Sequence, residues 1–162
     1  MKIGVDIRGV LIGKKGIDGD LFSVPNSLDS LQLLSKKNRL YIISYSKENM
    51  AQYNYTRLVD YDLFWAQYYV SDKSYKSSIV NYLNCDVMID DNENILNQIK
   101  TENPEVITIL FQRYNKQKKR SHRKHYLVED WQEVMNIVER LEIDNSSDDD
   151  VENKGLAYYI SE

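Results

Sequence analysis

The sequence predicts an α/β domain, a three-layer sandwich with a central parallel sheet of the Rossmann-like type. Short apolar runs, typical of strands buried on both faces, alternate with segments whose apolar residues have helical spacing. Such alternation indicates βαβ crossovers, in which helices cover both faces of a parallel sheet. The length of 162 residues is that of one domain with a single core.

The expected elements follow one another along the chain. Strands are expected at 2–7, 39–44, 63–70, 86–89 and 105–111, with a strand-like connection as the alternative for the third. Helices are expected from Ser27, taken as an N-cap, and at 47–59, 76–83, 92–100 and 129–141. Glycines between residues 9 and 19 indicate a loop or small hairpin after the first strand.

Polar residues stand at the ends of three expected strands. Asp6 lies at the end of the first strand, Ser44 ends the second, and Asp90 and Asp91 follow the fourth. Lys76 begins the helix before that fourth strand. Ligands of open parallel sheets bind outside the carboxyl ends of the strands, so we expect these five residues to meet at one edge.

These residue types suit phosphoryl chemistry. Asp6, Asp90 and Asp91 offer the hard oxygen ligands that Mg²⁺ prefers, and a carboxylate shielded in this way is able to attack phosphorus. The ammonium of Lys76 and the hydroxyl of Ser44 are suited to neutralising phosphoryl oxygens. Each residue has an alternative: a turn or helix-cap role for the acids and the serine, and a solvated surface position for the lysine.

The same residues resemble the motifs of the haloacid dehalogenase (HAD) superfamily over 2–111, or 2–141 with the last helix. VDIRGVL resembles the first motif, with Asp6 at the nucleophile, and LYIIS resembles the second, ending in Ser44. Lys76 resembles the third-motif lysine, for which Lys73 is the competitor. VMIDDNENIL resembles the fourth motif and is the most specific match.

The resemblance implies a Mg²⁺-dependent phosphohydrolase that forms an aspartyl-phosphate on Asp6. Asp90 and Asp91 are then metal ligands, and the backbone carbonyl of Arg8 is a further one. ITILFQRYN followed by VEDWQEV is similar to the end of the 5′(3′)-deoxyribonucleotidase branch. Phosphomonoesters are the implied substrates, with nucleotides or nucleic-acid ends as the favoured class.

Two features depart from the family pattern. The second aspartate of the first motif, the family's general acid and base, is replaced by Arg8. Arginine stays protonated at neutral pH, so hydrolysis is expected to be slow. Arg8 instead suits bidentate binding of phosphate, or an ion pair at the rim. The alternative function is a catalytically impaired HAD-like protein that binds a phosphorylated partner or nucleic acid.

The second departure is the absence of room for a large cap domain. About 38 residues separate Asp6 from Ser44, and about 32 separate Ser44 from Lys76. In this superfamily caps close over small substrates. A site without one is open, which by analogy favours a larger substrate such as a protein or a nucleic-acid end.

Residues 113–125 are strongly basic, although the net charge of the chain is −4. This loop is predicted to lie beside the active edge, where its cations are suited to phosphate backbones. A localisation signal and a solvated loop are the alternatives. The candidate nucleic-acid-binding residues are Lys116, Lys118, Lys119, Arg120, Arg123 and Lys124.

The remaining features bear on compartment and domain limits. The single cysteine, Cys85, favours a reducing compartment, and we find neither a signal-peptide pattern nor an apolar run long enough to cross a bilayer. The expected location is therefore cytoplasmic, or nuclear or within a viral factory for a eukaryotic or viral protein, with no membrane partner. The α/β domain is expected to cover 1–143, and 144–162 to form an acidic, flexible tail.

Overall fold

A computed structural model describes residues 1–13, 20–113 and 124–160, with side chains described up to residue 146. Its six strands form one parallel sheet in the order β3-β2-β1-β4-β5-β6. The strands are β1 (Lys2–Val5), β2 (Arg39–Tyr45), β3 (Phe64–Val70), β4 (Val87–Asp90), β5 (Ile107–Phe111) and β6 (Tyr126–Val128). The helices are α1 (Ser27–Leu34), α2 (Glu48–Val59), α3 (Tyr75–Leu83), α4 (Glu93–Glu102) and α5 (Trp131–Ile160).

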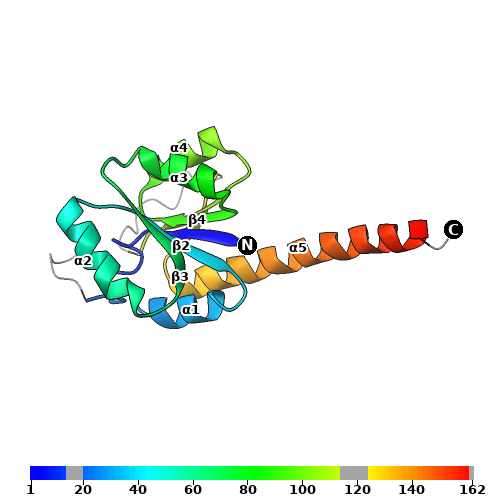
Figure 1. Ribbon diagram of the computed structural model, residues 1–162, viewed down its shortest axis with the longest axis horizontal. Helices are drawn as coiled ribbons and strands as arrows, with labels where there is room; N and C mark the ends of the chain where they lie inside the picture. Colours follow the sequence, from blue (N-terminus) through cyan, green and yellow to red (C-terminus); the bar gives the residue numbers. More distant parts are fainter. Residues whose placement is uncertain (14–19, 114–123, 161–162) are drawn as a thin grey trace.

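Both faces of the sheet are covered, which gives the predicted three-layer sandwich (Figure 1). Alternate residues of the central strands point to opposite faces, so that Ile42 and Ile89 join one core while Ile43 and Met88 join the other. The first core is completed by α1, α2 and α5, and the second by α3 and α4. Burial on both sides is the reason that these strands are continuously apolar.

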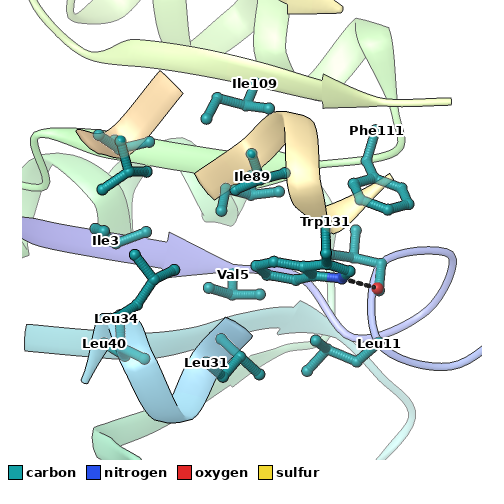
Figure 2. Packing of buried hydrophobic residues seen from close by; sticks show 14 of the residues in the cluster. Ile3, Val5, Leu11, Leu31, Leu34, Leu40, Ile89, Ile109, Phe111 and Trp131 are labelled. Atoms are coloured by element: carbon teal, nitrogen blue, oxygen red, sulfur yellow. Dashed lines mark hydrogen bonds between the residues drawn. The ribbon is translucent and has the colours of Figure 1, made fainter. Parts of the chain in front are cut away.

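Trp131 fixes the first turn of α5 against the segment that follows β1. Its side chain is fully buried, its ring centroid lies 6.0 Å from that of Phe111, and its indole Nε1 donates to the Val10 carbonyl at 3.0 Å (Figure 2). A buried indole N–H needs such a partner. The loop that leaves the carboxyl end of β1 is therefore anchored by the last helix of the chain.

The structure corrects two local expectations and confirms a third. Ser27 is the first residue of α1 instead of its N-cap; Asn26 precedes the helix with a left-handed φ of 63°. Residues 64–70 form a true edge strand, which settles the alternative for that segment. The strand at 107–111 is not the last, because β6 pairs with it. Such a three-residue strand has too few residues for an alternating pattern and depends on its neighbour.

The last helix is longer than the sequence predicted. Instead of ending near residue 141, α5 continues to Ile160 and extends beyond the body of the domain (Figure 1). The prediction ended the helix where its apolar stripe ended, but a helix can extend beyond such a stripe, and no proline follows to interrupt this one. The predicted domain boundary at residue 143 thus falls within a helix, and the flexibility of 144–162 stays a prediction. Of the described residues, no helix combines the length and apolar character needed to cross a membrane.

Candidate active site

Strand register brings the first two acids side by side. Val5 pairs with Ile89. The residues that follow them, Asp6 and Asp90, therefore lie side by side at the carboxyl ends of β1 and β4. The backbone N–H of Asp6 continues the ladder by donating to the Ile89 carbonyl at 3.0 Å. The strand order reverses between β1 and β4, which is where open α/β sheets bind their ligands.

Asp6 and Asp90 share one buried cation. The ammonium Nζ of Lys76 lies 2.9 Å from Asp6 Oδ1 and 2.8 Å from Asp90 Oδ2. Ser44 Oγ also donates to Asp6 Oδ1, at 2.8 Å. All four side chains are buried, and Lys76 is only 2% exposed. The structure thus brings together Asp6, Ser44, Lys76 and Asp90 as the sequence predicted, and their chemical roles stay predictions.

Charge and burial oppose each other at this cluster. Burial lowers the pKa of Lys76, but the Asp6 and Asp90 carboxylates outweigh it, so the pKa lies above its usual value and the ammonium is charged. Burial raises the pKa of Asp90 to about 7, with a further contribution from the Asp6 carboxylate and opposition from Lys76. The single positive charge of Lys76 therefore compensates only part of the negative charge of Asp6 and Asp90.

Asp91 completes a set of three carboxylates. One oxygen from each of Asp6, Asp90 and Asp91 lies within 4.8 Å of the others. Gly9 makes this approach possible: its φ is +86°, and a Cβ added there would overlap the Asp91 carboxylate. These three hard oxygen donors, whose negative charge Lys76 only partly compensates, fit a single Mg²⁺. The sequence placed Gly9 in a loop, whereas its contact with Asp91 is visible only in the fold.

Asn92 and Gln112 were not among the predicted site residues. The backbone N–H of Asn92 donates to Asp90 Oδ1 at 2.9 Å, and its side chain caps α4, accepting from Asn94 and Ile95. Gln112 follows β5, and its Oε1 is buried without a hydrogen-bond partner among the described residues. Its position directly after a strand, like that of Asp6, was the available signal in the sequence.

A cavity of about 670 Å³ opens over these groups. Arg8 is exposed and lines it, as does Lys73. Lys73 is exposed and its Nζ lies 5.4 Å from the ring centroid of Tyr45, whereas the Nζ of the buried Lys76 lies between the two acids. Lys76 is therefore the residue at the predicted lysine position, and Lys73 belongs to the rim.

Most of the predicted nucleic-acid-binding stretch lies outside the described residues. Lys116, Lys118, Lys119, Arg120 and Arg123 fall there, while Lys124 is described and exposed. His125 at its end is buried, with Nδ1 2.6 Å from Thr108 Oγ1 and Nε2 3.0 Å from Asn97 Oδ1. Through these contacts His125 links β5 and α4 to the start of β6.

Neither the protein-family models nor the curated proteins contain a match to this sequence. Among solved structures, a haloacid dehalogenase-like hydrolase of Streptococcus pneumoniae is similar at 17% identity with a TM-score of 0.59, covering 75% of this chain. The HAD-hydrolase YfnB of Bacillus subtilis, bound to magnesium, matches at 12% identity with a TM-score of 0.56, covering 70% of this chain. A 2-haloacid dehalogenase of Pseudomonas syringae matches at 13% identity with a TM-score of 0.57, covering 76% of it.

This chain spans 61%, 55% and 55% of the lengths of those three proteins. At such low identity the likeness is one of fold. The chain has the haloacid dehalogenase-like fold.

Proposed function

We propose that this protein is a HAD-superfamily phosphohydrolase that acts on phosphomonoesters through an aspartyl-phosphate. The observation that carries the proposal is the buried cluster at the carboxyl ends of β1 and β4, where Lys76 joins Asp6 to Asp90. Asp6, Asp90, Asp91 and the Arg8 carbonyl would hold one Mg²⁺. When bound, the metal supplies positive charge that stabilises a transferring phosphoryl group.

The contacts of Asp6 assign different tasks to its two oxygens. Ser44 and Lys76 both donate to Oδ1, so this oxygen is held and Oδ2 is the one to attack phosphorus. The new Oδ2–P bond forms as the bond from phosphorus to the leaving oxygen breaks, and the leaving oxygen takes a proton from water. A second water then hydrolyses the aspartyl-phosphate, which releases phosphate and restores Asp6.

Arg8 determines how fast both steps run. It stands where a carboxylic acid would protonate the leaving oxygen and then activate water, and guanidinium does neither at neutral pH. Its exposed position at the rim of the cavity suits it to pairing with a bound phosphate. We therefore expect slow turnover and firm phosphate binding.

Hydrolysis of p-nitrophenyl phosphate with Mg²⁺ tests this in wild type, Asp6→Asn and Arg8→Asp. Slow wild-type turnover should be abolished by Asp6→Asn and accelerated by Arg8→Asp, by about 10²–10⁴-fold, the usual contribution of general acid–base catalysis. No turnover in any of the three proteins, each shown to be folded by circular dichroism, would overturn the proposal.

Arg8 also supports a second candidate, a catalytically impaired protein that binds a phosphorylated partner or nucleic acid. Turnover that appears only in Arg8→Asp, together with phosphate binding by the wild type, would favour this candidate. A capless site is consistent with either candidate. The described residues between Asp6 and Lys76 form only α1, β2, α2, β3, the start of α3 and loops, and the cavity is open.

A further inference from the structure

A second cavity adjoins the candidate active site. It has a volume of about 300 Å³ and lies between the segment 7–13 after β1, the end of β2, and helix α2. Figure 1 shows α2 at the end of the sheet towards which β1 runs. Arg8 and Tyr45 line both cavities. Ser44, which donates to the Asp6 carboxylate, also lines the second one.

The two cavities have opposite linings. The first is walled by carboxylates, among them Asp90, Asp91 and Glu93. The described lining of the second contains no acidic residue; it combines aliphatic side chains with three cationic ones, and these residues are Ile7, Ile12, Met50, Arg8, Lys47 and Arg57. Aliphatic and aromatic side chains combined with polar groups are usual in a site for an organic ligand, and about 300 Å³ is the lower end of the usual size range.

Two tyrosines give this cavity a preference for flat groups. Tyr45 and Tyr53 line it, and they are 41% and 46% exposed, so their rings are accessible. The guanidinium carbon of Arg57 lies 4.8 Å from the ring centroid of Tyr53, which restricts the orientation of that ring. Aromatic rings at an accessible wall favour stacking or edge contacts with another ring.

We propose that the second cavity binds the alcohol part of an aromatic phosphomonoester while its phosphate lies at Asp6 and Lys76. The inference rests on the proposed function, because it takes the phosphate position from there. A phosphoryl group at Asp6 can direct its substituent towards the adjoining cavity, whose aliphatic and aromatic side chains suit a ring. Arg8, which lines both cavities, is placed to contact the phosphate from between them.

Non-hydrolysable phosphonates test the proposal without turnover. Isothermal titration of the full chain with Mg²⁺ compares methylphosphonate, phenylphosphonate and inorganic phosphate. We expect phenylphosphonate to bind about tenfold more tightly than methylphosphonate, because its ring leaves water. The affinities of thymidine 5′-phosphate and ribose 5-phosphate are compared with the catalytically blocked Asp6→Asn variant. Tighter binding of thymidine 5′-phosphate would show that a ring attached through a sugar is also favoured.

Two variants and one control decide the location. Met50→Trp fills the cavity and should abolish the preference for phenylphosphonate while leaving methylphosphonate affinity unchanged; Tyr53→Ala should reduce the preference. Tyr82→Ala, at a tyrosine that is 76% exposed on α3, should leave it intact. Equal binding of the two phosphonates by wild type, or a preference that survives both cavity variants, would overturn the inference alone. Failure of every phosphonate and of phosphate to bind would overturn the proposed function and the inference with it.

Discussion

The two cavities that meet at Arg8 and Tyr45 differ in what holds their walls in place. The polar cavity is organised by charge: one buried ammonium joins two buried carboxylates, and a third carboxylate closes over Gly9. The second cavity is organised by packing, since the segment 7–13 is held to the core by Trp131 and faces α2. Substitutions in the first cavity should therefore change stability and binding through electrostatics. Substitutions in the second should act by moving the loop at 7–13.

The largest expected effect comes from Lys76→Met. Removing the ammonium leaves Asp6 and Asp90 buried without their cation, and breaking a buried pair in this way costs about 3–5 kcal/mol. Urea unfolding monitored by circular dichroism measures the free energy. Mg²⁺ should restore part of the loss. Lys73→Met, at the rim of the same cavity, is the control and should change stability by less than about 0.5 kcal/mol. Equal losses in both variants would contradict an electrostatic cause.

Trp131→Phe tests the packing half of the comparison. An aromatic ring remains, but the N–H donor to the Val10 carbonyl is lost, so a buried oxygen is left without its partner at a cost of about 1–3 kcal/mol. The smaller ring also leaves a cavity in the core, which adds to the loss. Urea unfolding gives the size of the loss. Trp65→Phe is a matched control, because Trp65 is 65% exposed and should tolerate the change. If the two variants were equally stable, Trp131 would not be the anchor of this segment.

Gly9→Ala tests the contact between the loop after β1 and Asp91, and it should have the smallest effect on the free energy of unfolding. An added Cβ meets the Asp91 carboxylate and strains a backbone with φ of +86°, so Asp91 has to move. We expect the Mg²⁺ dissociation constant, measured by isothermal titration, to rise about tenfold, as for other changes that misplace a metal ligand.

Asp91→Asn provides the comparison for that variant. It should weaken Mg²⁺ binding by a similar factor, and the double variant Gly9→Ala/Asp91→Asn should be no weaker than Asp91→Asn alone, because both changes act on one ligand. Fully additive losses would show that Gly9 affects the metal by another route.

The helices and strands were predictable to different degrees. The central strands were evident because burial on both faces makes each an uninterrupted apolar run. β6 was missed because three residues carry no pattern and its position depends on pairing with β5. The end of α5 was missed because its apolar stripe ends near residue 141, and the residues after it have no periodic pattern that shows whether the helix continues.

The sequence by itself determined which groups could gather at one edge. Asp6, Ser44 and Asp90 each belong to an apolar strand that ends in a polar residue, and parallel strands bring such ends together. Lys76 was chosen over Lys73 by its place in a family motif, and the structure gives the physical reason, since only Lys76 is buried between the two acids.

Only the tertiary structure decided how those groups are arranged and what adjoins them. That Gly9 admits Asp91, that Trp131 holds the loop after β1, and that this loop and α2 enclose a second cavity all depend on contacts between distant segments. Local patterns reflect the burial of a residue and its own backbone preferences. They contain no information on which distant side chain comes to lie against it, and that is the kind of contact from which both cavities are built.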